Sequence, residues 1–464
     1  YVLLLKFNRG NTASLFLSLI FAVHPVLNQA LAWIPGRNDS LLAIFVFSSF
    51  IFFINLMAKE NLRNLFVHSA FFALAMFTKE TAASLPLACL AYYVLLSQNK
   101  LSLKFKYYLA EIWVGVFGAW FFLRNAVLKI EDLAASSIVQ MAINHSSAIL
   151  IYIGKIIFPF KLSVLPTLAD SSVLYGLISL FAILALVLIS KKSYRPVLLV
   201  RQSLGVGGSN IEGLALFGVL WFLLFIAPVL VSYDHESRVV FFEHRIYVPM
   251  AGFLIILLSV NWEKIISASS KIIRIFMAGI IAALFAVTTV HLRDFKDGLS
   301  FWQSAVKNSP SLSRSHKGLG TVYFNENNFE LAETAYMKAL ELNPEEKVVH
   351  NNLGVVYVNK KMFDEAEGEF KKETELNPLY EPAYYNLGRL YAQEKNFSEA
   401  EKYWLKALEL KPDYIQVHQD LAVYYFQKAD YKASLNHINE IIKYGALLHP
   451  ELAKVKALFD AQAQ

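Results

Sequence analysis

The chain has 464 residues, of which 56% are hydrophobic and 36 are phenylalanine, and this composition excludes an ordinary soluble protein of this length. The formal net charge of +6 is modest, and the basic residues lie in short loops between apolar runs, so nothing favours nucleic-acid binding. The single Cys89 excludes an intrachain disulfide framework, and the scattered histidines predict no metal site.

We predict an all-α chain whose residues 1–292 form a polytopic membrane domain, because the apolar residues are concentrated there. The chain begins at Tyr1 within what resembles the end of an apolar helix, so we expect the natural sequence to start upstream. About nine segments are long and apolar enough to span, or nearly span, roughly 30 Å of hydrocarbon: 12–34, 40–58, 64–78, 82–97, 108–124, 172–190, 213–232, 246–260 and 273–291.

The loops richest in Lys and Arg set the predicted orientation, because short cytoplasmic loops are enriched in these residues. These loops are 58–63, 98–106, 191–201 and 263–274. All four are cytoplasmic only if the mixed apolar and polar segment near 138–158 does not cross the membrane. We therefore predict an interfacial or re-entrant helix there, on the outer side. The alternative is a true span that leaves one basic loop outside.

This topology collects the unusual charged motifs on the outer side. They are "PGRND" (35–39), "TKET" (78–81), the long segment 125–171 and "SYDHESRVVFFEHR" (232–245). The chain after residue 291 leaves on the same side, so we expect the C-terminal region to be extracytoplasmic.

The C-terminal region repeats every 34 residues and predicts tetratricopeptide repeats over 313–446. A Leu-Gly pair followed by Tyr recurs in "KGLGTVY", "NNLGVVY" and "YNLGRLY", and prolines recur at the same spacing: Pro310, Pro344, Pro378 and Pro412. The fourth unit carries Ala422 at the Gly position, as expected of a terminal unit. We predict a junction with half a repeat over 293–312 and a tail helix over 447–464.

Two sets of polar residues recur within the repeats. His316, His350 and His418 occupy equivalent positions, where packing explains them. Asn352 and Asn386 recur on the first helix of their units, on the face that normally lines the groove. An amide both donates and accepts, so we predict that these asparagines bind the backbone of an acceptor peptide. The alternative is a polar contact between helices.

The three consecutive residues Glu243, His244 and Arg245 stand just before an apolar helix. A charge at the bilayer centre costs about 2.5–3.5 kcal/mol on insertion scales, so these side chains stay at the interface or line a polar cavity. They are either flanking charges or a binding site. In the second case Arg245, with His244, holds a phosphate through its planar fork, and Glu243 orients the guanidinium or a sugar hydroxyl.

Four further residues belong to the predicted outer site. Arg37 is a candidate contact to phosphate or sugar, and Asp39 either joins it or caps the helix that follows. Lys79 and Glu80 either neutralise each other in a tight hairpin or hold a carrier phosphate, whose leaving charge needs fixed positive partners.

The basic residues near the predicted interfacial helix are weaker candidates. Lys155 and Lys161 lie in "GKIIFPFKLS". Lysines in such a position usually contact lipid headgroups.

Four motifs precede the repeats: "FAVHPVLNQALAWIPGRNDSLLA", "FTKETAASLP", "IYIGKIIFPFKLS" and "FEHRIYVPMAGF". Together with the tetratricopeptide repeats that follow, they resemble membrane glycosyltransferases of the GT-C type that carry such repeats. Their eukaryotic relatives are the transmembrane and tetratricopeptide-repeat O-mannosyltransferases, and the E-H-R-x-Y-x-P form resembles bacterial members. The resemblance implies transfer of a sugar from a polyprenyl-phosphate carrier to an acceptor outside the cytoplasm, and we expect the acceptor group to be a protein hydroxyl. It also places the catalytic acid in a first outer loop, which we expect upstream of Tyr1.

The predicted function is therefore that of an enzyme of the bacterial inner membrane whose repeats recruit the acceptor protein. The donor is a polyprenyl-phosphate-linked sugar, no other cofactor is predicted, and the partners are the bilayer, the donor and the acceptor. A non-catalytic membrane scaffold that organises envelope proteins through its repeats is the alternative. A polyprenyl-linked glycan polymerase or ligase is a second alternative, in which the repeats bind a partner enzyme.

Overall fold

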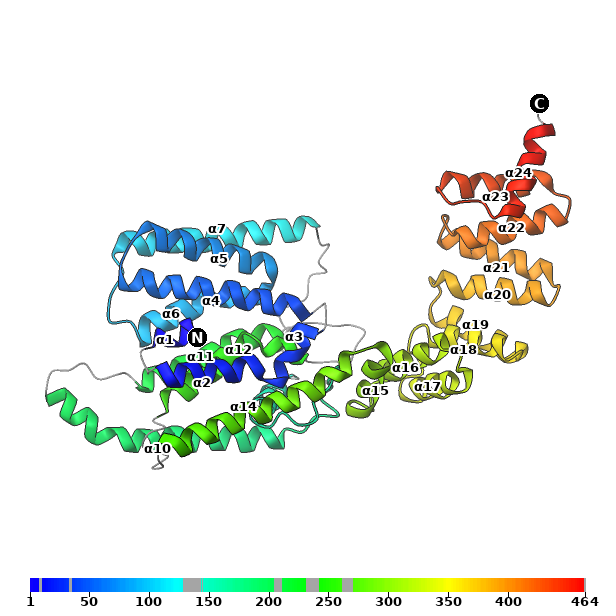
Figure 1. Cartoon of the computed structure of the whole chain (residues 1–464). Coiled ribbons are helices and arrows are strands. Elements are labelled where there is room, and N and C mark those ends of the chain that lie inside the picture. Colours follow the sequence, from blue (N-terminus) through cyan, green and yellow to red (C-terminus); the bar gives the residue numbers. More distant parts are fainter. Residues whose placement is uncertain are drawn as a thin grey trace. The chain divides into compact units, whose positions relative to one another are not determined.

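The computed structural model describes residues 1–7, 11–32, 36–127, 143, 145–203, 211–230, 242–260 and 270–462. All regular structure within these ranges is helical, which confirms the all-α prediction (Figure 1). The chain divides into two compact units, Tyr1–Ser309 and Pro310–Gln464, called here the N-terminal unit and the repeat unit.

The N-terminal unit is built from long helices joined by short helical turns. Its first half contains α1 (Val2–Leu5), α2 (Asn11–Val23), η1 (Pro25–Leu27), α3 (Asn28–Ala32), α4 (Arg37–Ala58), α5 (Leu62–Thr78), η3 (Glu80–Ser84), α6 (Leu85–Leu95) and α7 (Leu103–Val127). Its second half contains α9 (Ser147–Ile157), α10 (Leu174–Ser203), α11 (Ile211–Leu230), η4 (Glu243–Ile246), α12 (Pro249–Ser259), α14 (Ser270–Leu292), η5 (Arg293–Phe295) and α15 (Gly298–Asn308).

Three helical segments among the described residues are long and apolar enough to cross a membrane: Arg37–Ala58, Glu212–Leu230 and Arg274–Phe295. In the last of these, only 11% of the most apolar stretch is buried inside the protein. Such an outward apolar surface is what lipid contact requires. Other predicted spans correspond to shorter apolar helices such as α5, α6 and α12, so the total of nine spans stays a prediction.

The predicted span 12–34 is interrupted at its centre. Helix α2 ends at Val23, and the following His24 has extended backbone angles, as expected of a residue that precedes proline. His24 caps the short helix η1 by accepting a hydrogen bond from the backbone N–H of Val26 at 3.3 Å. The chain then continues into α3, so this segment forms three short elements.

Helices α11 and α12 pack side by side (Figure 1). They approach closely at two glycines, and both contact η4, which lies shortly before α12 in the chain. A Cβ atom on Gly218 would lie 2.6 Å from the carbonyl oxygen of Gly252, and one on Gly252 would lie 2.5 Å from that of Gly218. Small residues permit such close packing of membrane helices. The buried Trp221 on α11 also donates its indole N–H to the carbonyl of Val248 at 3.0 Å.

The predicted interfacial segment 138–158 is described only at 143 and from 145 onward. Helix α9 within it has 11 residues and is therefore about 16 Å long, roughly half of the hydrocarbon thickness. It packs against α10, where Gly154 and Gly176 approach each other closely. By its length α9 alone is too short to cross a bilayer, while the outer location of this segment stays a prediction.

The repeat unit consists of successive helix pairs and a final helix. The pairs are α16 (Ser313–Asn325) with α17 (Phe329–Leu342), α18 (Val349–Asn359) with α19 (Phe363–Leu376), α20 (Glu381–Gln393) with α21 (Phe397–Leu410), and α22 (Ile415–Gln427) with α23 (Tyr431–Lys443), followed by α24 (Pro450–Gln462). The predicted half repeat forms helix α15, which belongs to the N-terminal unit.

Within each of the first three pairs, a glycine on the first helix receives an aromatic ring from the second. A Cβ atom on Gly320 would lie 2.7 Å from the ring of Tyr336, and one on Gly354 would lie 2.6 Å from Phe370. The equivalent distance from Gly388 to Trp404 would be 2.3 Å. In the fourth pair, Ala422 and Ile438 occupy these positions within one buried cluster. The recurring Leu-Gly pair therefore makes room for a ring.

The repeat histidines serve packing, as predicted. The Nε2 atoms of His316, His350 and His418 lie 3.0, 3.3 and 2.9 Å from the carbonyl oxygens of Pro310, Pro344 and Pro412. In the third repeat, the hydroxyl of Tyr384 donates to the carbonyl of Pro378 at 3.2 Å. Each of these rings ties the start of a repeat to the proline that precedes it.

Candidate functional site

Side chains of the "HPVLNQ" segment (24–29) connect three distant parts of the N-terminal unit. His24 Nε2 donates to the carbonyl of Ile156 at 2.8 Å, since its other ring nitrogen accepts from Val26. Asn28 donates to the carbonyl of Thr288 at 3.1 Å. Gln29 donates to the carbonyl of Val164 at 2.7 Å. The segment therefore holds the end of α9, the chain at Val164 and the end of α14 close to one another.

Asp39 and Lys79 form a close ion pair at the start of α4. The Lys79 Nζ atom lies 2.8 Å from each carboxylate oxygen of Asp39, whose side chain is only 6% exposed. Lys79 therefore does not neutralise its neighbour Glu80, which is exposed. Asp39 is not the helix cap either, because Gly36 occupies that position. Arg37, in the same first turn, is exposed.

The antiparallel packing of α4 against α5 explains this pairing. The turn between the two helices contains Lys59, and Asp39 lies 20 residues before it while Lys79 lies 20 residues after it. In a helical hairpin of this kind, positions equally distant from the turn lie side by side. The extended backbone of Lys79 also directs its side chain away from that of Glu80. Sequence symmetry about the turn was the signal that could have found the pair.

His244 lies between Gln29 and the ion pair. Its ring nitrogen Nδ1 lies 3.0 Å from Gln29 Oε1, and its backbone N–H donates to the same oxygen at 3.3 Å. Its Nε2 atom lies 3.6 Å from Asp39 Oδ2. Burial, assisted by the positive charges of Lys79 and Arg245, lowers the pKa of His244 well below its usual range. Two of the predicted outer motifs thus meet at this ring.

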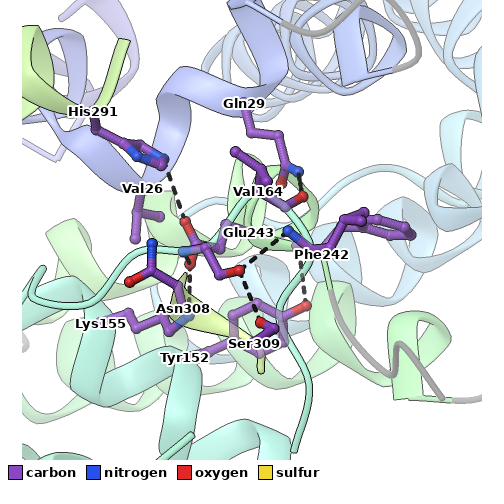
Figure 2. Close-up of polar contacts among 12 residues, drawn as sticks. Val26, Gln29, Tyr152, Lys155, Val164, Phe242, Glu243, His291, Asn308 and Ser309 are labelled. Carbon is purple, nitrogen blue, oxygen red and sulfur yellow. Dashed lines mark hydrogen bonds and ion pairs between the residues drawn. The ribbon is translucent and has the colours of Figure 1, made fainter. Parts of the chain in front are cut away.

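Glu243 lies in a buried network with Lys155 and His291 (Figure 2). Its carboxylate oxygen Oε1 accepts from Lys155 Nζ at 2.5 Å and from the backbone N–H of Ser163 at 3.0 Å. Glu243 is 1% exposed and Lys155 is 8% exposed. Lys155 is therefore not a surface contact to lipid headgroups. Glu243 neutralises this lysine and does not orient Arg245 as predicted.

The remaining oxygen of Glu243 faces His291 near the end of α14 (Figure 2). Glu243 Oε2 lies 3.9 Å from His291 Nε2, and neither atom has a hydrogen-bond partner among the described residues. The Nδ1 atom of His291 lies 2.8 Å from Asp294 Oδ2. The hydroxyl of Ser163 also lies 2.9 Å from that of Ser309, the last residue of the N-terminal unit. The network thus extends to the residue that precedes the repeats.

Arg245 is half-buried, with its guanidinium 5.2 Å from the ring centre of Phe242. Its charge acts on both Asp39 and His244. Arg245 thus adds a positive charge close to the Asp39–Lys79 ion pair and to the ring of His244. Within the described ranges, no group of three or more His, Cys, Asp or Glu side chains could hold a metal ion.

Hydrogen bonds through Asn351 connect the asparagines of two neighbouring repeats. Asn351 was not among the residues predicted from the sequence. Asn386 donates to the side-chain oxygen of Asn351 at 2.8 Å, and Asn351 lies 3.4 Å from the side-chain oxygen of Asn352. Asn351 is buried, whereas Asn352 and Asn386 are half-buried. The predicted contact between helices is therefore present. The predicted binding of a peptide by Asn352 and Asn386 stays a prediction.

Residues 2–121 match the model of a family described as dolichyl-phosphate-mannose-protein mannosyltransferase. Residues 313–346 and 382–414 match the tetratricopeptide repeat. The N-terminal part of this chain is a glycosyltransferase family domain, and its C-terminal part is a tetratricopeptide-repeat domain. The recognition from sequence motifs is thus confirmed. Together with the three apolar segments, the family match indicates a membrane protein. None of the curated proteins compared with the chain matches it.

Similar solved structures include PilF of Pseudomonas aeruginosa, with 22% identity over 35% of this chain and 75% of that chain, and a TM-score of 0.33. MamA of Desulfovibrio magneticus RS-1 shares 22% identity over 32% of this chain and 83% of that chain, with a TM-score of 0.29. YrrB, a tetratricopeptide-repeat protein with an unusual peptide-binding site, shares 23% identity over 32% of this chain and 75% of that chain, with a TM-score of 0.27.

Proposed function

We propose that the chain belongs to a GT-C glycosyltransferase that moves a sugar from a polyprenyl-phosphate carrier to a protein hydroxyl. The transfer takes place on the extracytoplasmic side of a membrane, which in a bacterial cell is the inner membrane. The repeat unit recruits the acceptor protein. The match of residues 2–121 to a mannosyltransferase family supports the reaction class.

The observation that carries this proposal is the meeting of two separate segments at His244. Gln29, Asp39 and Lys79 lie within the residues that match the family, whereas His244 and Arg245 lie far outside them. His244 nevertheless contacts Gln29 Oε1 at 3.0 Å and approaches Asp39 Oδ2 to 3.6 Å. These contacts support a single site formed by the family domain and the "EHR" motif, whose polar groups suit a substrate that combines a phosphate with sugar hydroxyls.

Within this site Arg245 is the best candidate for the carrier phosphate. Loss of the polyprenyl phosphate builds negative charge on the leaving group, and a fixed guanidinium stabilises that charge. Lys79 is already held by both oxygens of Asp39, so its ammonium has less charge to offer. Arg37 is exposed near Asp39 and is a second candidate.

The half-buried asparagines of the repeat unit support recruitment of an extended peptide. Asn351 already takes one hydrogen bond from Asn386, and this contact orients the amide row. An oriented amide loses less side-chain entropy when it binds a peptide backbone. Backbone recognition of this kind accepts acceptor proteins of different sequence.

Reconstituted full-length protein, given a polyprenyl-phosphate sugar and an acceptor protein, tests the proposal by mass spectrometry of the acceptor. We expect Arg245→Ala to reduce transfer at least a hundredfold, because one transition-state contact of this type is worth about that much. Arg245→Lys should recover only part of the activity, because lysine lacks the bidentate fork.

The matched control is Arg274→Ala, which removes an exposed arginine of the same unit from the start of α14. This variant should retain wild-type transfer. Unchanged turnover in Arg245→Ala would contradict the assignment of the phosphate site. A wild-type protein that binds its partner proteins but never transfers a sugar would favour a non-catalytic scaffold.

A further inference from the structure

Helix α15 (Gly298–Asn308) has the pattern of a second repeat helix but lacks the first helix of such a pair. Its Trp302 lies 34 positions before Tyr336, and the equivalent residues of the next two repeats are Phe370 and Trp404. Those three rings are at most 4% exposed, because each packs against the glycine of its own first helix. The chain before α15 forms α14 and carries Phe-Ala where the repeats carry Leu-Gly. Trp302, without such a glycine, is only half-buried.

An apolar stripe runs along α15 through Leu299, Trp302 and Val306. Their spacing of three and then four residues places them on one face of the helix, and all three are half-buried. The repeats carry a glutamate at the position of Leu299, and a quarter of each glutamate side chain is exposed to water: Glu333, Glu367 and Glu401. A position that is polar and open to water in the repeat unit is therefore apolar in α15.

Helix α15 lies close to the end of an apolar segment that is long enough to cross a membrane (Figure 1). That segment ends at Phe295, and two residues link it to α15. They reach at most about 11 Å, and the headgroup layer is about 5–8 Å thick. The ring of Phe295 lies 5.9 Å from that of Phe301, which lies 5.1 Å from the ring of Trp302. Helix α15 therefore begins within or beside the headgroup layer of a membrane that α14 crosses.

The surface that leads from α14 to α15 changes from apolar to basic. Near the end of α14, Val290 is 62% exposed and Leu292 is 42% exposed. Arg293 and Lys296, which follow them, are exposed and positively charged. Apolar side chains followed by basic ones, with a tryptophan close by, are typical of the boundary between hydrocarbon and lipid headgroups. The apolar stripe of α15 thus continues a surface that suits lipid.

We propose that α15 lies in the headgroup layer at the end of α14, with Leu299, Trp302 and Val306 inserted among the lipids in place of a first repeat helix. The bilayer is the occupant of this face, because the stripe continues the outward apolar surface of α14 after a link of only two residues. The inference goes beyond the proposed function, since it concerns a lipid contact and holds whichever reaction the protein performs. The N-terminal unit then contacts the membrane surface up to α15, next to its last residue, Ser309.

Two tryptophans at equivalent repeat positions provide a matched test in the full-length protein, reconstituted in phosphatidylcholine vesicles. Trp302→Phe and Trp404→Phe each remove one indole and keep an aromatic ring, as Phe370 does in the second repeat. Brominated phosphatidylcholine quenches indoles that touch lipid. We expect it to quench the fluorescence that is lost in Trp302→Phe, and not the fluorescence that is lost in Trp404→Phe, because Trp404 is 4% exposed. Equal quenching of the two signals would contradict the inference.

Nitroxide labels on single cysteines locate the stripe by a second, independent signal. Val306→Cys is compared with Leu340→Cys, which has the same position in the next repeat and is also half-buried. Phe285→Cys, at a 58% exposed position of α14, is the reference for lipid, and Lys307→Cys, at an exposed position of α15 outside the stripe, is the reference for water. Cys89 is fully buried, so the unaltered chain gives the blank.

The quantity measured is the ratio of collisions of each label with oxygen, which concentrates in lipid, to collisions with a nickel complex, which stays in water. We expect the ratio at Val306 to exceed the ratios at Lys307 and Leu340 and to shift toward that at Phe285. If a cysteine variant fails to fold, the tryptophan pair still decides, because phenylalanine already occupies the equivalent position of one repeat.

Three outcomes would overturn the inference. A ratio at Val306 equal to that at Lys307 would show that the stripe faces water. Exclusion of both reagents from Val306 would show that protein covers the stripe, such as a second copy of this chain. A ratio at Leu340 as high as that at Val306 would assign the lipid contact to repeat helices in general and not to α15.

Discussion

The two units of this protein differ in how far apart their decisive contacts lie along the chain. In the repeat unit, each glycine and the ring that it receives are 16 positions apart, as in Gly388 and Trp404. In the N-terminal unit, the contacts that build the site join residues 40 to 260 positions apart, such as Lys79 with Asp39 and Asn28 with Thr288. The repeat unit is therefore stabilised by contacts between residues that are close in sequence, whereas the site depends on contacts across the whole N-terminal unit.

The largest expected effect is a loss of stability in the N-terminal unit, at the buried ion pair between Glu243 and Lys155. Glu243→Ala leaves Lys155 buried without its carboxylate, and breaking a buried ion pair from one side costs about 3–5 kcal/mol. Denaturant unfolding of the detergent-solubilised protein measures this loss of stability.

The double variant Glu243→Ala with Lys155→Ala provides the control, because it removes both charges. It should be more stable than the single variant, since no buried charge is left unpaired. Equal destabilisation in the single and double variants would mean that packing, and not charge, determines the stability of this region.

A smaller effect is expected in the repeat unit. Gly388→Ala places a Cβ atom 2.3 Å from Trp404, and overpacking of this kind costs about 1–3 kcal/mol. The change should remain local, so hydrogen exchange should accelerate in α20 and α21 and not in the N-terminal unit.

Two variants sharpen this prediction. Gly368→Ala lies in a helix with no atom within 4 Å of the new Cβ, so it should stabilise the protein by about 1 kcal/mol through helix propensity. Gly388→Ala combined with Trp404→Ile copies Ala422 and Ile438 of the fourth repeat and should recover part of the loss. No recovery would mean that the repeats are less interchangeable than their period indicates.

The smallest effect is a pH dependence confined to the last repeat. Burial, with the nearby His418, lowers the pKa of His437 to about 4 from its ordinary value of 6.5. The folded state then binds fewer protons than the unfolded state between these values, so stability is complete above pH 6.5 and decreases as the pH falls toward 4. We expect a loss of about 1 kcal/mol, reduced by the partial exposure of His437.

Hydrogen exchange in α22 and α23, corrected for the intrinsic effect of pH, measures this dependence. His437→Glu gives this repeat the residue that Glu369 provides in the second repeat, where it lies 2.6 Å from His350. The variant should lose the decrease in stability at acid pH. A decrease that persists in His437→Glu would assign the titration to another group.

The repeat architecture could be predicted from sequence because its period repeats the same contact several times. Gly320, Gly354 and Gly388 recur with an aromatic residue 16 positions later, and one correct interpretation therefore covers the entire unit. The contact between repeats through Asn351 was not predicted. The equivalent position in the next repeat is Tyr385, so no asparagine repeats at this position every 34 residues.

The candidate site was predicted only as a list of residues. Their placement on the outer side stays a prediction from topology and motifs, and their partners were not predicted. Lys79 was expected beside Glu80 and instead pairs with Asp39, and Glu243 was expected beside Arg245 and instead pairs with Lys155. A charged side chain can pair with a neighbour in sequence or with a residue from a distant segment, and the packing of the helices determines which pair forms. Gln29 carried no signal, since an isolated glutamine is common on any helix.

The break at His24 and Pro25 has a consequence for how the protein is made. The side chains that follow it find their partners at Ile156, Val164 and Thr288. During synthesis, the ribosome must therefore add more than 250 residues after Asn28 before the last of these partners exists. Until then the polar groups of this segment depend on water, lipid headgroups or a chaperone for their hydrogen bonds. The motif at the centre of the site is therefore synthesised long before the last of its final contacts can form.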